Sequence, residues 1–164
     1  MSVSDTARAR ALAPDAMLIE TMGYDPQKGV PMIEAHLERM KHSAAELGFE
    51  CDRHAIRNEV QAVCFTHREP ARLKIELKRS GQFAIRLSKY PDPMIEPVAV
   101  ALVRLDIEAD DPRLRHKTSD RCFYEEARAE AENRGAKEAI LVRDDGLVTE
   151  GSFTSVFVDR GDCL

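Results

Sequence analysis

The feature that most constrains the fold is a change in the spacing of apolar residues between residues 32 and 87. In Met32–Leu47 and Arg53–Thr66, apolar residues recur every three or four positions, which predicts two amphipathic helices. In Arg72–Lys78 and Phe83–Leu87 they recur at every second position, on either side of a Ser-Gly turn. This second pattern predicts a hairpin with one polar face, and the combination predicts an α+β unit.

Two further apolar runs, Met17–Met22 and Val98–Val103, predict strands that complete this unit. We therefore expect a polar tail at residues 1–14, an N-terminal α/β domain at 15–105, a linker at 106–115 and a C-terminal domain at 116–164. The C-terminal domain should begin with a helix that Thr118 or Ser119 caps and Gly135 ends. Three strands should follow it, at Ala139–Val142, Leu147–Glu150 and Thr154–Val158.

Charge and composition exclude several classes of protein. The 164 residues contain 24 Lys and Arg against 29 Asp and Glu, so no basic field favours a nucleic-acid partner. The apolar runs are too short to cross a membrane, and the N-terminus lacks the apolar core of a signal peptide. The four cysteines, at positions 51, 64, 122 and 163, form no metal-binding pattern. We expect reduced thiols, no metal and a cytoplasmic protein.

The common nucleophile, phosphate-loop, dinucleotide and zinc-protease motifs are all missing. Three charged residues stand in unusual surroundings instead. Lys117 directly precedes a predicted helix, Glu150 ends an apolar strand before a glycine, and Arg39 lies within the first helix. Each residue taken alone is more often a solvated surface charge or half of a salt bridge.

Four tracts that contain or adjoin these residues resemble the class IV aminotransferases. They are Leu18–Met22, His36–Met40, His116–Thr118 and Asp145–Ser152, and they occur in the order found in that family. The family includes branched-chain and D-amino acid aminotransferases and 4-amino-4-deoxychorismate lyase. The resemblance implies a two-domain fold-type IV enzyme that uses pyridoxal 5'-phosphate, with a small α/β N-terminal domain and a partial, barrel-like C-terminal domain.

The resemblance also implies a role for each charged residue. Lys117 corresponds to the lysine that forms a Schiff base with the cofactor and then moves the α-proton as a general base and acid. Glu150 corresponds to the acid that pairs with the pyridine nitrogen and keeps the ring protonated. Arg39 corresponds to the phosphate-binding arginine, whose fork of donors suits phosphate oxygens. Thr154 is implied as a further cofactor contact.

Substrate binding is predicted for three residues of the N-terminal domain. Thr21 stands where the deoxychorismate lyases also carry threonine, and Lys74 is the first choice for a residue facing the site, with Arg72 second. A solvent-facing charged stripe is an equally good interpretation of this strand. In the family the partner subunit completes the site, so the resemblance implies a homodimer that binds a small-molecule substrate.

Departures from the family pattern leave the reaction open. Ser155 and Cys122 replace an asparagine and a tyrosine, and the tyrosine is typical of branched-chain enzymes. The Gly-x-Leu-x-Gly turn that should follow the last strand does not occur before Leu164, so we expect a truncated second domain. The first prediction is amino transfer between an amino acid and a 2-oxo acid. The alternatives are pyruvate release from aminodeoxychorismate to give 4-aminobenzoate, and a truncated, non-catalytic binding or dimerisation module.

Overall fold

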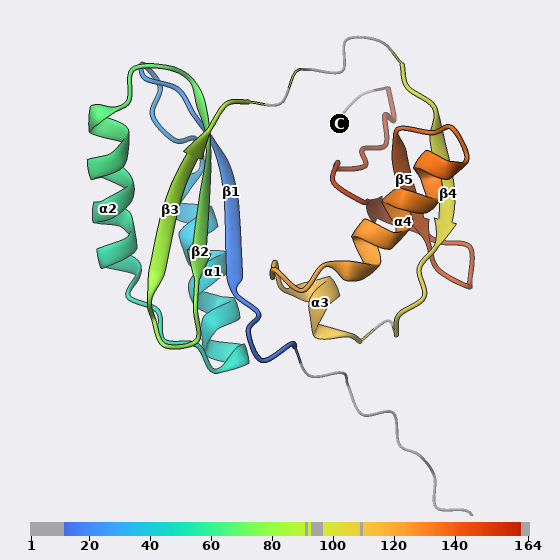
Figure 1. Cartoon of the computed structure of the whole chain (residues 1–164), viewed down its shortest axis with the longest axis horizontal. Helices are drawn as coiled ribbons and strands as arrows, with labels where there is room; N and C mark the ends of the chain where they lie inside the picture. The colour runs from blue at the N-terminus through green and yellow to red at the C-terminus, as the bar shows by residue number, and fades with distance from the viewer. Residues whose placement is uncertain (1–11, 91, 93–96, 109, 162–164) are drawn as a thin grey trace, which may run out of the picture. The chain divides into compact units, whose positions relative to one another are not determined.

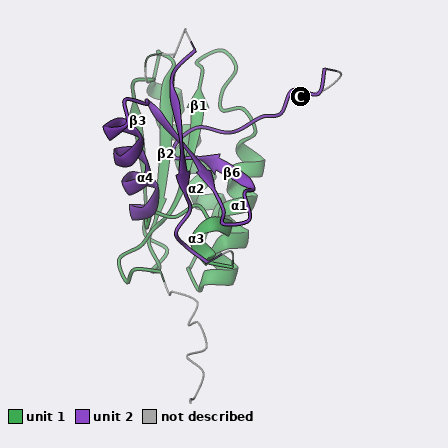
Figure 2. Cartoon of the chain, turned by 90° about the vertical axis from the view of Figure 1, so that its right-hand side faces the viewer, with its two compact units in different colours: residues 1–92, 110–120 green, residues 93–109, 121–164 purple. Residues whose placement is uncertain are grey.

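The computed structural model describes residues 12–90, 92, 97–108 and 110–161. The chain divides into two compact units, which Figure 2 colours separately. Unit 1 comprises Met1–Asp92 and Asp110–Asp120, and unit 2 comprises Pro93–Ala109 and Arg121–Leu164. These units divide the chain differently from the predicted boundaries. Residues 93–105, expected in the N-terminal domain, group with unit 2, because the strand at Val100–Arg104 pairs with a later strand of that unit. Residues 110–120 group with unit 1, where the segment around Lys117 hydrogen-bonds to Met17 and Ile19.

Unit 1 is a three-stranded antiparallel sheet with two helices on one face (Figure 1). The strand order is β1 (Leu18–Tyr24), β2 (Ala71–Leu77) and β3 (Phe83–Ser88). The covering helices are α1 (Ile33–Leu47) and α2 (Arg53–Thr66). The two helices and the hairpin predicted from apolar spacing are therefore confirmed.

Local sequence explains where these elements begin and end. Asp52 begins α2, because its side chain accepts a hydrogen bond from the amide of Ala55. Gly48 ends α1 with a φ of 72°, a left-handed conformation that glycine adopts without strain. Alternate residues of the strands then meet the apolar stripes of the helices, and together they form one core. Its buried members are Leu18, Met22, Leu37, Met40, Ala44, Phe49, Ile56, Val60, Leu73, Ile75 and Leu77.

A segment distant in sequence extends this sheet at the free edge of β1. The amide of Ile19 donates to the carbonyl of Lys117 at 2.9 Å, and the amide of Ser119 donates to the carbonyl of Met17 at 2.8 Å. Leu18 and Thr118 oppose each other in an antiparallel bridge. Residues 117–119 thus behave as a short extra strand. A short helix, α3 (Pro112–Arg115), precedes them within the predicted linker.

Unit 2 contains a second three-stranded sheet, with the order β4 (Val100–Arg104), β5 (Glu138–Val142) and β6 (Val148–Gly151). Strands β4 and β5 are parallel, whereas β5 and β6 are antiparallel. The connection between the parallel pair contains α4 (Cys122–Asn133), which packs on both strands (Figure 1). The buried residues of α4 are Tyr124, Ala127 and Ala131.

Two local predictions in unit 2 are wrong. Residues 154–158 form no strand and are mostly exposed, since no neighbouring strand in the described part of the chain pairs with them. Helix α4 begins after Arg121, without a side-chain cap. Thr118 and Ser119 do not cap it because they pair with β1, where the Ser119 hydroxyl accepts a hydrogen bond from the amide of Met17.

Within the described ranges, no helix combines the length and the apolar character needed to cross a membrane. Cys51 and Cys64 are reduced thiols whose pKa values burial raises, so they are less reactive than exposed cysteines. Cys163 lies outside the described residues.

Candidate functional site

Arg39 is held by a buried carboxylate that the sequence reasoning missed. Glu20, on β1, is 1% exposed. It pairs with Ile75 in the sheet register, so it shares the core face with Leu18 and lies toward α1. From α1, Arg39 donates from Nε to Oε1 of Glu20 at 2.7 Å and from Nη2 to Oε2 at 2.5 Å. Glu20 thus takes Nε and one N–H of Nη2, two of the five guanidinium N–H groups that the sequence assigned to phosphate.

The N–H groups of Arg39 that Glu20 leaves determine what this side chain can bind. Both N–H groups of Nη1 and one of Nη2 make no hydrogen bond with any described residue, and half of the Arg39 side chain is exposed. The hydrogen bonds to Glu20 raise the pKa of Arg39, so the guanidinium stays charged. Nδ1 of His36 lies 2.8 Å from the same carboxylate. A lone acid in an otherwise apolar strand was the signal in the sequence that could have pointed to Glu20.

Lys117 lies on the face of the first sheet that the helices leave open. Because Thr118 opposes Leu18, the Thr118 side chain shares the core face, where it is buried. Side chains alternate along an extended segment, so Lys117 belongs to the opposite face and is half-buried. Thr21 occupies this open face by the same alternation along β1. The register thus brings Lys117 and Thr21 to one face.

His116 joins the Lys117 segment to α1. Its ring is buried, with Nδ1 3.0 Å from the Ser43 hydroxyl and Nε2 3.2 Å from the Glu46 carboxylate. Burial lowers the pKa of His116 below its usual value of 6.5, although the Glu46 charge opposes this effect. The neutral ring is therefore the form that makes these contacts with α1. The contacts hold residue 116 in place, and with it the adjoining backbone of Lys117.

This burial predicts a loss of stability in acid. In the unfolded chain His116 takes up a proton near pH 6.5, whereas the folded protein resists it, so its contribution is complete above that pH and falls below it. Urea unfolding between pH 7.5 and 5.5 should show a steeper loss of stability for the wild type than for His116→Gln. The difference in slope should be at most about 1.4 kcal/mol per pH unit. His54→Gln, at an exposed position, should keep the wild-type slope, and equal slopes for His116→Gln and wild type would contradict the prediction.

The predicted substrate residues occupy the same open face as Lys117. Lys74 pairs with Thr21 on one side and with Arg86 on the other. Its ammonium donates to Glu76 at 2.7 Å, and Nε of Arg86 donates to the other oxygen of Glu76 at 2.9 Å. These two cations, Lys74 above all, hold the pKa of Glu76 below its usual range. A cavity of about 450 Å³ on this face is lined in part by Glu76 and Arg86.

Arg72, the second choice, lies one step further along β2 and is exposed, opposite Gly23 and Ser88. The open face thus combines Arg72 with Lys74 and Arg86, and the last two both contact the carboxylate of Glu76. Sequence reasoning missed Arg86, because its pairing with Lys74 becomes visible only in the register of the hairpin.

Glu150 belongs to unit 2, where a buried tyrosine orients it. The Tyr124 hydroxyl donates to Oε1 of Glu150 at 2.6 Å, while Oε2 has no hydrogen-bond partner among the described residues. Burial and this hydrogen bond raise the pKa of Tyr124, so the phenol remains a donor. The Arg121 guanidinium lies 4.1 Å from the centre of the Tyr124 ring and donates to the carbonyl of Ser152 at 3.1 Å. Cys122, at the position of the family's tyrosine, is exposed.

A second buried carboxylate shapes the turn that follows Glu150. Oε1 of Glu138 accepts hydrogen bonds from the amides of Ala139 and Ser152 and from the Ser152 hydroxyl, at 2.8, 3.0 and 2.5 Å. Its Oε2 accepts from the amide of Thr154 at 3.1 Å. Burial raises the pKa of Glu138, but these hydrogen bonds outweigh it and the net pKa is lowered. Gly151 has no room for a Cβ, which would collide with Thr154.

The predicted residues therefore fall into two groups. Unit 1 holds Lys117, Thr21, Lys74 and Arg72 on its open face, and it holds Arg39 on the helix side of β1. Unit 2 holds Glu150 and Thr154.

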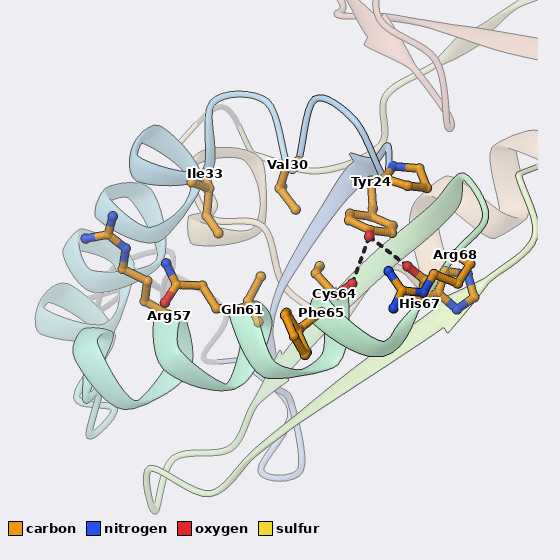
Figure 3. A pocket seen from close by; sticks show the side chains of 12 residues that line it. Tyr24, Val30, Ile33, Arg57, Gln61, Cys64, Phe65, His67 and Arg68 are labelled. Atoms are coloured by element: carbon orange, nitrogen blue, oxygen red, sulfur yellow. Dashed lines mark hydrogen bonds between the residues drawn. The ribbon is translucent and has the colours of Figure 1, made fainter.

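A cavity of about 410 Å³ in unit 1 contains none of the predicted residues (Figure 3). It lies between α2 and the segment that follows β1. The Tyr24 hydroxyl at its rim donates to the carbonyls of Cys64 and His67, as the dashed lines in Figure 3 show.

Comparisons with known proteins identify the family of the chain. The chain matches the family model described as amino-transferase class IV over residues 17–164. A Schizosaccharomyces pombe protein with the name "Putative aminodeoxychorismate lyase" is 29% identical over 157 residues, which cover 89% of this chain and 64% of that protein. The chain thus spans less than two thirds of the length of this curated relative.

Solved structures show the same fold. The structure of a "Putative amino-acid aminotransferase" from Mesorhizobium loti is 35% identical, with a TM-score of 0.79, and the match covers 90% of this chain and 72% of that one. A fold IV transaminase from Curtobacterium pusillum is 23% identical, with a TM-score of 0.71, over 91% of this chain and 60% of that one. The predicted fold class is confirmed by these matches.

Proposed function

Because the chain belongs to the class IV aminotransferase family, we propose that it is a pyridoxal 5'-phosphate enzyme that transfers an amino group between an amino acid and a 2-oxo acid. The observation that carries the proposal is the position of Lys117. Pairing with β1 holds the backbone of its segment, and the register places Lys117 opposite Ile19, on the open face that also holds Thr21 and Lys74. This arrangement supports a primary amine presented to a small acidic substrate.

The donors and acceptors available in each unit fit the cofactor. Arg39 keeps three N–H groups of its charged guanidinium, two on Nη1 and one on Nη2, for phosphate oxygens. Glu150 keeps one carboxylate oxygen for a ring N–H, while Tyr124 holds the other. When bound, the cofactor supplies an aldehyde for the amine and an electron-withdrawing ring that stabilises negative charge at the substrate α-carbon.

The proposed work of the chain is binding and proton transfer. Lys117 Nζ would hold the cofactor through its aldehyde group, and the same amine would remove the substrate α-proton and carry it. Glu150 would hold the ring N–H, with its carboxylate kept in place by Tyr124. Lys74 and Arg72 provide positive charge for a substrate carboxylate, and Thr21 and Thr154 provide hydroxyls.

A lyase reaction is the second candidate, supported by Thr21 and by the name of the Schizosaccharomyces pombe relative. Both reactions begin with removal of the α-proton by Lys117, and they differ in whether a leaving group is then expelled. Assays of pyruvate release from aminodeoxychorismate and of amino transfer to 2-oxoglutarate separate them. Amino transfer without pyruvate release would exclude the lyase, and the reverse result would exclude the transaminase.

Covalent trapping tests the proposed function directly. The protein is incubated with pyridoxal 5'-phosphate, reduced with borohydride, digested and examined by mass spectrometry. We expect one pyridoxyl adduct, on Lys117, because reduction converts the condensed amine into a stable secondary amine. Lys89→Ala, at an exposed lysine of unit 1, should retain the adduct, whereas Lys117→Ala should lose it. An adduct on another lysine, or none, would overturn the proposal and favour a non-catalytic binding or dimerisation module.

The homodimer and the cytoplasmic location stay predictions of the family resemblance and the composition. That a partner subunit completes the substrate-binding site is part of the same proposal.

A further inference from the structure

The contact between Glu20 and Arg39 is built differently from a surface ion pair. Glu20 is 1% exposed, whereas half of the Arg39 side chain reaches solvent. Two parallel hydrogen bonds join them, and Nδ1 of His36 lies against the same carboxylate. A carboxylate buried to this degree is stable only when its partners stay in place. Glu20 therefore has a fixed set of partners. Among them, Arg39 is the charged partner whose side chain is exposed to solvent.

This pairing restricts how Arg39 can act. An arginine on a helix surface ordinarily samples many rotamers and can present its fork to an anion. Here Nε and one N–H of Nη2 donate to Glu20, so the plane of the guanidinium is fixed. Both N–H groups of Nη1 and the second N–H of Nη2 make no hydrogen bond with the described residues.

We infer that Glu20 is a positioning residue for cofactor binding, which orients Arg39 so that its remaining N–H groups, two on Nη1 and one on Nη2, donate to the phosphate of pyridoxal 5'-phosphate. The inference rests on the proposed function and names a residue that the family resemblance did not assign. It predicts that Glu20 governs recognition of the phosphate and has no effect on recognition of the ring and aldehyde.

Comparison of two ligands isolates that effect. Pyridoxal shares the ring and aldehyde of pyridoxal 5'-phosphate but lacks the phosphate, so the ratio of their affinities measures phosphate recognition alone. Equilibrium dialysis of the full chain with each ligand gives this ratio without any need for turnover. We expect Arg39→Ala to lower the wild-type preference for the phosphorylated ligand by about 10-fold or more, the effect of losing one charge-assisted hydrogen bond.

Glu20→Gln should lower the ratio in the same direction, because an uncharged amide no longer holds both donors of Arg39. In the double variant Glu20→Gln/Arg39→Ala the loss should equal that of Arg39→Ala alone, since Glu20 acts through Arg39. Arg57→Ala is the matched control. Arg57 is similarly exposed, pairs with Glu34 on the helix face, and should leave the ratio unchanged.

The possible results distinguish a failure of the role inferred for Glu20 from a failure of the proposed function. A wild-type ratio in Glu20→Gln, with Arg39→Ala impaired, would overturn the role of Glu20 and leave the function standing. An equal loss of affinity for both ligands in Glu20→Gln would assign Glu20 a purely structural role and would also overturn the inference. If wild-type protein bound neither ligand and formed no adduct at Lys117, the proposed function would fail, and this inference with it.

Discussion

Replacing Lys117 by alanine should lower the rate of amino transfer, or of pyruvate release, by about 10²- to 10⁴-fold, the range typical for loss of a positioned acid–base group. The variant keeps the backbone hydrogen bond to Ile19, so β1 and the segment 117–119 should stay paired. The change therefore removes the amine and leaves the backbone pairing that positions it. Steady-state rates with the substrate that the wild type prefers provide the measurement.

Chemical rescue separates a role in proton transfer from a structural one. A small primary amine such as methylamine, added to Lys117→Ala, should restore part of the rate, because it can carry the proton that Lys117 no longer moves. Lys89→Ala, at an exposed lysine, should keep the wild-type rate. Retention of more than a tenth of the rate by Lys117→Ala, in the absence of amine, would contradict the assignment.

Replacing Glu138 by glutamine should cost unit 2 about 3 kcal/mol of unfolding free energy, because one oxygen that accepts hydrogen bonds becomes an NH₂ facing other donors. Whichever way the amide is oriented, it leaves at least one of the donors at Ala139, Ser152 or Thr154 without its acceptor. The turn carrying Glu150 should loosen with it. Urea unfolding of wild type and variant at pH 7.5 measures the difference.

The pH dependence of the same variant gives a second readout. The pKa of folded Glu138 is lowered, so its stabilising contribution is present above the unfolded-state value of 4.5 and is lost as the pH falls through the folded value. Glu138→Gln should therefore lose less stability on acidification than the wild type does. Glu126→Gln, on the exposed side of α4, should change stability by less than about 0.5 kcal/mol. Similar values for the two variants would show that the Glu138 hydrogen bonds contribute little.

Apolar spacing alone was enough to predict α1, α2, β2 and β3. Each of these elements buries one face, so its period appears in the sequence whatever its partners are. Thr154–Val158 has an apolar composition too, but a strand needs a neighbour to pair with, and none is described beside it. The predicted caps of α4 fail for a related reason, since Ser119 accepts a hydrogen bond from Met17 instead.

The candidate site, like the fold, was predicted in part from local sequence and depends in part on distant residues. Short tracts around Arg39, Lys117 and Glu150 were enough to identify the family and to predict these residues as its reactive groups. Their partners lie far away in the sequence. Glu20 is 19 residues from Arg39, and Tyr124 is 26 residues from Glu150.

The sequence by itself thus determined α1, α2 and the three strands of unit 1 and the family, and it predicted the reactive groups. Only the tertiary structure decided which donors of Arg39 remain for an anion, which face of the sheet Lys117 occupies, and which carboxylate supports the turn after Glu150. The physical reason is that hydrophobic period is a local property of the chain. The allocation of hydrogen bonds among buried polar groups depends instead on which distant residues the fold brings within about 3 Å of one another.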